Sequence, residues 1–236
     1  MDSEPYEEED LIPYRGILSG TKRDDFYAFF TREDFKNDQS QIQNLIQFMT
    51  REVLNKIQES PDEFNEEILR PLYDIPDGVQ KNQWIYEQMR CFIMEIAQFA
   101  GELESECTGS NCPKMNAGGF EYMCASHLKP QACCAIDYIS HTIETVWSLL
   151  NNKKQFADRK AITDKNVEAL QGMARRLYRV FSHVYFQHKE SVFDAYEQAT
   201  YLHVRFKLFS ERYSLVTKDN FIDILQEKDK KVPKKQ

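Results

Sequence analysis

Residues 79–106 read VQKNQWIYEQMRCFIMEIAQFAGELESE, and this stretch decides the fold. Its large apolar side chains recur every three or four positions, as on one face of an α-helix: Trp84, Phe92, Ile93, Ile96, Phe99, Ala100 and Leu103. The stretch is apolar enough to be the central helix of a bundle. It ends directly before Cys107, so the predicted helix delivers the chain to that cysteine.

Further helices are predicted around this central one. Apolar residues follow helical spacing in residues 41–60, 135–151, 164–182 and 190–213, and a short helix is expected after Thr217. Residues 120–124 alternate as a strand does, and Lys129-Pro130 is typical of a turn, so a small β-hairpin is expected there. The predicted fold class is all-α, a helical bundle with one small hairpin.

The two ends of the chain differ from its middle. Residues 1–20 are polar and acidic, whereas residues 227–236 are basic, and neither stretch has a hydrophobic period. Both are expected to be disordered, and residues 21–226 are expected to form one domain.

The charge balance limits the class of function. The chain has 30 basic and 38 acidic residues, a formal charge of −8, which argues against a nucleic-acid-binding protein. The acidic start, MDSEPYEEEDLIPY, does not resemble a signal peptide, and no apolar run approaches a membrane span. We therefore expect a cytoplasmic protein without integral membrane association, whose six cysteines are reduced thiols or metal ligands.

Two cysteines and two histidines form a candidate metal site. Cys107 and Cys112 lie in SECTGSNC, and His183 and His188 follow in FSHVYFQHK. Two thiolates and two imidazoles suit zinc, and four protein ligands fill a tetrahedral site, so the ion would be structural. The alternative is that these are ordinary buried side chains. On an unbroken helix the two histidines would lie about 140 degrees apart, so the site requires the helix to end or distort between them.

One predicted helix carries charge on a single face. At about 100 degrees per residue, Arg175, Arg176 and Arg179 fall within one arc, opposite the apolar side chains. No acidic residue lies three or four positions away from them, and such unpaired like charges cost a few tenths of a kcal/mol each, roughly. Converging guanidinium groups suit a phosphate group on a partner peptide. The alternative is a solvated face that only aids solubility.

The segment from about Lys22 to Leu225 resembles the Mob/phocein family of kinase-associated adaptors, in particular its phocein branch. The resemblance is carried by DFYAFF, DGVQKNQWIYEQMR, ELESECTGSNC, AIDYISHTIE, RRLYRVFSHVYFQH and RFKLFSERYSLVTKDN. It implies a Mob-type helical bundle without catalytic activity. It also implies one structural zinc, held by Cys107, Cys112, His183 and His188, and a basic surface for phosphorylated kinase segments. Arg175, Arg176 and Arg179 fall on the motif for that surface, and Lys129 is a further candidate.

The resemblance also bears on partners. Family members that activate the NDR and LATS class of kinases carry acidic residues just before the tryptophan that corresponds to Trp84, whereas this chain has Val79 and Gln83 there. This departure argues against direct activation of those kinases. The phocein branch implies instead an assembly of a striatin-type scaffold, germinal-centre (sterile-20-like) kinases and protein phosphatase 2A. A peripheral place on Golgi or endosomal membranes is a further expectation.

Two other functions stay open at this stage. A zinc hydrolase would need an open metal position and a general base, and Glu190 is the only obvious candidate for the base. Nucleic-acid binding through a finger-like metal site would need a basic helix beside the cysteines, which the chain lacks.

Overall fold

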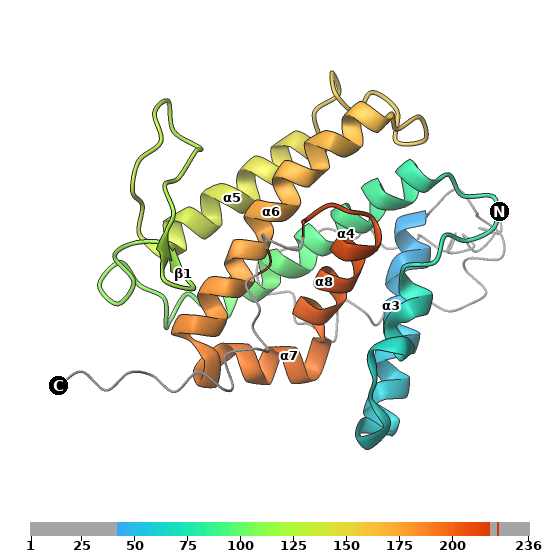
Figure 1. Cartoon of the computed structure of the whole chain (residues 1–236), viewed down its shortest axis with the longest axis horizontal. Coiled ribbons are helices and arrows are strands. Elements are labelled where there is room, and N and C mark those ends of the chain that lie inside the picture. Colours follow the sequence, from blue (N-terminus) through green and yellow to red (C-terminus); the bar gives the residue numbers. More distant parts are fainter. Residues whose placement is uncertain (1–41, 218–220, 222–236) are drawn as a thin grey trace, which may run out of the picture.

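The computed structural model describes residues 42–217 and residue 221 (Figure 1). The main helices are α3 (Ile42–Glu59), α4 (Lys81–Gly101), α5 (Ala135–Leu150), α6 (Asp164–Gln187), α7 (Asp194–Thr200) and α8 (Leu202–Arg212). Two 3-10 helices, Pro61–Glu63 and Glu66–Leu72, precede α4, and a π-helical turn, Lys189–Phe193, precedes α7. The all-α prediction is confirmed. The predicted acidic and basic ends, the start of the domain and the short helix after Thr217 lie outside the described residues.

Helix α4 is the centre of the bundle, as its apolar spacing predicts. It packs against α3, α5, α6 and α8, and Trp84, Met89 and Ile96 on it are fully buried. Aromatic rings join it to α6, α7 and α8, with Phe92 against Phe206 of α8 at 5.2 Å between centroids. Burying one such side chain contributes about 1.5–3 kcal/mol, whereas an exposed ion pair contributes about 0–1 kcal/mol. The apolar face of α4 therefore dominates the stability of the fold.

Helices α5 and α6 lie side by side and run in opposite directions (Figure 1). Helix α6 begins at a capping box, in which the Thr163 hydroxyl accepts from the Asn166 amide and the Asn166 side chain accepts from the Thr163 amide. This cap satisfies two of the amide groups that every helix start leaves without a partner. It fixes where the long charged helix begins.

The small hairpin is displaced from its predicted position. Strand β1 (Asn116–Ala117) pairs with β2 (Phe120–Glu121) around Gly118 and Gly119, which both have positive φ. Residues 120–124 therefore do not form one strand that turns at Lys129-Pro130. A single bridge between Cys124 and Gln131 closes the longer loop that contains that turn.

The predicted helix over residues 190–213 is broken into three parts. Tyr201 has φ 51°, in the left-handed region, which ends α7 and lets α8 start in a new direction. Arg205 of α8 is fully buried and forms an ion pair with Glu95 of α4, and its Nε donates to the Thr200 carbonyl at 2.9 Å. These contacts hold the broken segment against the central helix.

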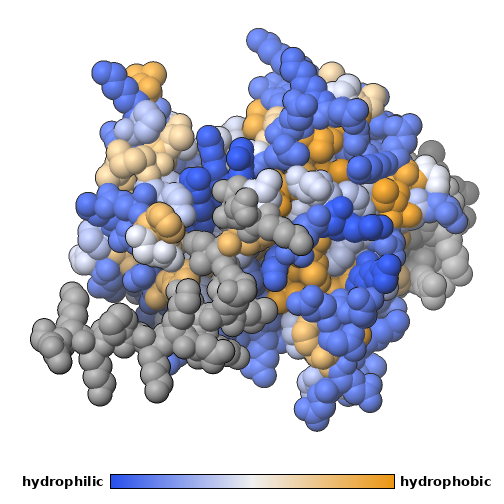
Figure 2. All heavy atoms as spheres, in the orientation of Figure 1, coloured by the Kyte–Doolittle hydropathy of each residue, from blue (hydrophilic) through white to orange (hydrophobic). Residues whose placement is uncertain are grey.

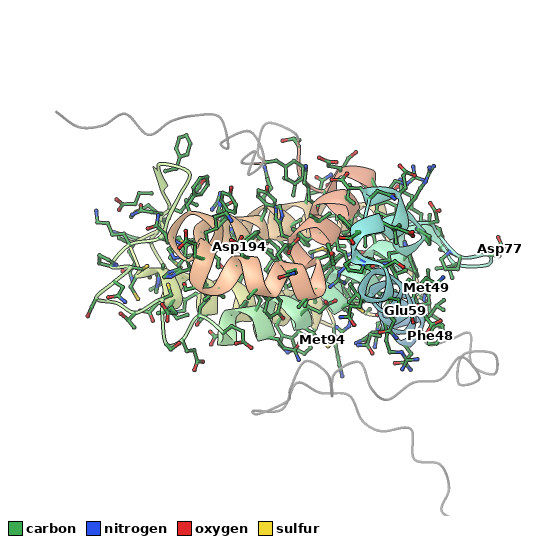
Figure 3. All side chains as sticks on the ribbon, turned by 90° about the horizontal axis from the view of Figure 1, so that it is seen from below. Phe48, Met49, Glu59, Asp77, Met94 and Asp194 are labelled. Carbon is green, nitrogen blue, oxygen red and sulfur yellow. The ribbon has the colours of Figure 1, made fainter. Side chains whose placement is uncertain are left out.

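The hairpin of β1 and β2 lies at one end of the molecule and α3 at the other. The hairpin stands beside the start of α5 and the end of α6 (Figure 1). Figure 3 shows Phe48, Met49 and Glu59 on α3 at the opposite end, with Asp77 at the tip of the loop that leads to α4. The face in Figure 2 is mostly hydrophilic, with smaller hydrophobic patches between. In the described part of the chain, no helix has both the length and the hydrophobicity that a membrane span requires.

Candidate metal centre and arginine face

The candidate metal centre consists of Cys107, Cys112, His183 and His188, and the structure brings all four residues together. Their ligand atoms lie within 4.8 Å of one another, and all four residues are buried. The loop after α4 supplies the cysteines, and the Cys107 amide donates to the Leu103 carbonyl at 2.7 Å, which closes a turn in this loop. The end of α6 supplies the histidines. Segments 76 residues apart in the chain therefore meet at one point.

The predicted distortion between the two histidines is confirmed. Helix α6 ends at Gln187, and His188 leaves helical geometry with φ −134° and ψ 34°. The π-helical turn Lys189–Phe193 follows directly. This change of backbone direction rotates the His188 ring toward the same point as the His183 ring, and the ring centroids lie 5.4 Å apart.

The spacing of donor atoms fits a tetrahedral ion. Cys107 Sγ lies 3.4 Å from His183 Nε2, and Cys112 Sγ lies 3.3 Å from His188 Nε2. Metal distances of about 2.0 Å to nitrogen and 2.3 Å to sulfur place such atoms about 3.5 Å apart around tetrahedral zinc. These two distances match the spacing around a zinc-type ion, and four protein ligands would leave no position for water or substrate in a tetrahedral site.

The surroundings prepare the histidines for metal binding. His183 Nδ1 donates to the Asn116 carbonyl at 2.7 Å, which fixes the tautomer whose Nε2 lone pair points at the cysteines. Burial lowers the pKa of His183 and of His188, so both rings are neutral near pH 7. Burial and the neighbouring Cys112 raise the pKa of Cys107 to about 12. A bound cation would offset that cost, because a coordinated thiol loses its proton.

The arginine face is the outer side of α6, formed by Arg175, Arg176 and Arg179. The opposite side is buried and includes Leu170, Ala174 and Leu177. Arg175 is exposed and the other two arginines are half-buried. Helix α6 is therefore oriented as the sequence predicts, with its apolar side in the core and the three arginines on the outer side.

Two tyrosines hold one arginine of this face in place. Arg179 Nη1 donates to the Tyr138 hydroxyl at 2.9 Å, and its guanidinium lies 4.4 Å from the centre of the Tyr122 ring. Tyr138 comes from α5 and Tyr122 follows β2, so two neighbouring elements fix the position of this cation. Sequence reasoning did not find either tyrosine, since nothing in their spacing relates them to α6.

Lys129 lies on a different segment from the three arginines. It is exposed in the loop that the bridge between Cys124 and Gln131 closes. No recorded hydrogen bond or ring contact within residues 42–217 joins it to Arg175, Arg176 or Arg179. The structure therefore brings the arginines together and leaves Lys129 on a neighbouring loop.

Comparison with known proteins identifies the family. The model of the Mob1/phocein family matches residues 62–224. The chain belongs to the Mob1/phocein family.

Curated relatives agree with this assignment. The chain is similar to a Drosophila melanogaster protein named MOB kinase activator-like 4, with 40% identity over 149 residues, 63% of this chain and 66% of the relative. A Caenorhabditis elegans MOB-like protein phocein is 34% identical over 209 residues, 86% of each chain. The Schizosaccharomyces pombe maintenance of ploidy protein mob1 is 33% identical over 141 residues, 57% of this chain and 67% of the relative.

In this Mob/phocein chain, neither Val79 nor Gln83, which precede Trp84, carries a charge. Val79 and Gln83 are both half-buried, and Trp84 is fully buried in a small cluster with Ile42, Ile46, Cys91 and Met94. The tryptophan thus serves the contact between α3 and α4.

Proposed function

We propose that this chain is a noncatalytic adaptor, whose zinc-stabilised bundle presents the arginine face to a phosphorylated segment of a germinal-centre (sterile-20-like) kinase. The proposal includes membership of an assembly with a striatin-type scaffold and protein phosphatase 2A. Membership of the Mob1/phocein family supports it, as do the relatives named phocein and kinase activator-like.

The observation that carries the proposal is the contrast between the arginine face and the other arginines. Five of the latter each contact a carboxylate: Arg70, Arg90, Arg159, Arg205 and Arg212. Arg175 and Arg176 form no recorded ion pair with any described residue, and the recorded contacts of Arg179 are with two uncharged tyrosines. A positive surface that residues 42–217 leave without counter-charge, and that is partly fixed in advance, suits a phosphate group.

The metal centre supports a structural role for zinc in this proposal. Four buried protein ligands fill a tetrahedral set, so a bound ion has no place for an activated water. Glu190, the candidate general base, is exposed on the turn after His188. The zinc would bind the end of α6 to the loop after α4. It would thereby fix the position of α6, and with it the arginine face, relative to α4.

Partner choice within the family follows from the uncharged positions before Trp84. Because Val79 and Gln83 carry no carboxylate, they cannot pair with a basic kinase segment as the acidic residues of NDR and LATS activators do. We therefore infer that this chain does not directly activate kinases of that class. This inference favours the phosphorylated kinase segment as the point of contact.

Calorimetry with two peptides tests the proposal. A phosphothreonine peptide from a germinal-centre kinase should bind the full chain more tightly than its unmodified form. Charge-assisted hydrogen bonds contribute about 1.5–3 kcal/mol, so the double variant Arg175→Ala, Arg176→Ala should lose roughly tenfold to a hundredfold in affinity. Lys165→Ala is the matched control, because Lys165 is an exposed cation in the first turn of the same helix.

Equal affinity for the two peptides would contradict the proposal, as would unchanged binding by the double variant. Affinity purification followed by mass spectrometry then identifies the client. A kinase that is lost with the double variant, while striatin-type and phosphatase subunits remain, is the phosphorylated partner.

A further inference from the structure

A second group of two cysteines and two histidines lies outside the metal centre. It consists of Cys124, His127, Cys133 and His141, whose potential ligand atoms all lie within 4.8 Å of one another. Cys124 follows β2, and His127 lies in the loop beyond it. Cys133 lies two residues before α5, and His141 lies in the second turn of that helix. We call these four residues the second cluster.

The distances within the second cluster fit the same tetrahedral chemistry as the metal centre. His141 Nδ1 lies 3.6 Å from Cys124 Sγ and 3.9 Å from Cys133 Sγ. His127 Nε2 lies 3.0 Å from Cys133 Sγ, and the two imidazole rings are perpendicular with centroids 4.9 Å apart. Sulfur and nitrogen ligands of tetrahedral zinc lie about 3.5 Å apart, so these three distances lie within about half an ångström of the spacing that a bound ion would require.

The backbone already holds this loop in the shape that such a site requires. The Cys124 amide donates to the Gln131 carbonyl at 2.8 Å, and the Gln131 amide donates back to the Cys124 carbonyl at 3.2 Å. The Ser126 hydroxyl donates to the His141 carbonyl at 3.3 Å and lies 2.9 Å from the Thr145 hydroxyl. The loop is therefore closed at its base and attached to α5 on the side where His141 lies.

The second cluster differs from the metal centre in its exposure. Cys124 is buried, but the other three residues are half-buried. Ser126, His127 and His141, with Glu144 and Thr145 of α5, line an open hollow of about 510 Å³. Solvent and chelators can thus reach the histidine side of the second cluster, whereas the metal centre is enclosed.

We propose that the second cluster binds a second structural zinc-type divalent cation, coordinated by Cys124, His127, Cys133 and His141. Two thiolates and two imidazoles are the ligand set that such an ion prefers, and the four come from three segments that the fold brings together independently of the metal centre. The ion fixes the loop over residues 124–133 onto α5. This loop carries Lys129 and directly follows Tyr122, which lies against Arg179.

Metal content tests the second site without reference to peptide binding. The full chain is purified under reducing conditions, and zinc per chain is measured by inductively coupled plasma mass spectrometry. We expect two ions per chain for the wild type and one ion for Cys133→Ser. His127→Ala, in the half-buried loop, should also leave one ion and provides a second variant that does not change a cysteine.

Cys134→Ser is the matched control, because Cys134 is also half-buried, adjoins Cys133 and belongs to neither group of ligands. It should retain two ions. A chelator titration should remove one ion from the wild type before the other, and the early loss should be absent from Cys133→Ser.

The proposal is overturned if the wild type holds a single ion, or if Cys133→Ser and His127→Ala both retain two. It is also overturned if peptide mapping finds Cys124 joined to Cys133 by a disulfide in place of a bound ion. A second site that fails in this way leaves the metal centre and the arginine face unaffected, so its failure is distinct from that of the proposed function.

Discussion

Removing the ion from the metal centre should destabilise the whole bundle by an amount that follows from chain topology. A bound ion would join residues 76 positions apart, since Cys107 lies against His183 and Cys112 lies against His188. The entropy that such a cross-link removes from the unfolded chain corresponds to about 4.5 kcal/mol for a loop of this length. For a chain of this size, 1 kcal/mol shifts the melting temperature by about 2–4 °C, so the loss should lower it by roughly 9–18 °C.

The measurement must separate the two proposed ions. Differential scanning calorimetry on Cys133→Ser, with and without a strong chelator, reports on the metal centre alone because this variant lacks the second site. The triple variant Cys133→Ser, His183→Ala, His188→Ala lacks ligands in both groups and controls for effects of the chelator itself, so its melting temperature should not respond to the chelator.

The reasoning is refuted if metal analysis shows that the chelator has emptied Cys133→Ser while its melting temperature moves by less than about 2 °C. In that case the loop after α4 and the end of α6 would be held together by packing alone. The position of the arginine face would then not depend on a bound ion.

Three further predictions concern stability. Glu95→Gln should cost about 3–5 kcal/mol in urea unfolding because it removes the carboxylate that forms an ion pair with the buried Arg205, and adding Arg205→Met should recover most of that loss. Burial lowers the pKa of His203 from its ordinary 6.5 to about 3. Below pH 6.5 the unfolded chain therefore binds a proton at His203, whereas the folded chain does not. Stability should therefore fall by up to about 1.4 kcal/mol per pH unit below 6.5 from this residue, and His203→Leu should show a shallower decline between pH 6.5 and 5. Thr163→Ala removes the side-chain cap of α6 and should cost about 1 kcal/mol, measured by thermal unfolding, whereas Thr163→Ser should be nearly neutral.

Helix positions were predictable because burial decides them. The observed α3 and α5 begin and end within one residue of the predicted ranges, since each has a continuous apolar stripe. The break at Tyr201 was not predictable, because tyrosine rarely adopts positive φ and the apolar spacing continues through it. Phe64 stacks on the Tyr201 ring at 4.3 Å between centroids, a contact between distant segments that local spacing does not reveal.

The candidate site was predictable to the extent that its residues are close in sequence. The paired spacing of Cys107 with Cys112 and of His183 with His188 suggested the metal centre, and a rotation of about 100 degrees per residue placed the three arginines on one face. The second cluster was missed although its residues span only positions 124–141, because its histidines stand singly and are joined to the cysteines only by the fold. A search for Cys-x2-His followed by a further cysteine and histidine would have found it.

The position of Arg179 yields a prediction that separates binding from stability. Tyr138→Phe removes the hydroxyl that accepts from Arg179 but leaves the buried ring, so the cation loses one of the two groups that fix it. If the arginine face binds phosphate through a guanidinium held in advance, affinity for the phosphothreonine peptide should fall by about 1 kcal/mol, or roughly fivefold.

Tyr86→Phe is the control for that measurement, because the buried Tyr86 hydroxyl also accepts from an arginine, Arg90 Nη1 at 3.4 Å, and donates to the Leu150 carbonyl at 2.7 Å. Both variants should lose comparable thermal stability, but only Tyr138→Phe should bind the peptide more weakly. Equal affinities for the two variants would mean that Arg179 binds the phosphate equally well without this hydrogen bond. Tyr138 would then serve only the packing of α5 against α6.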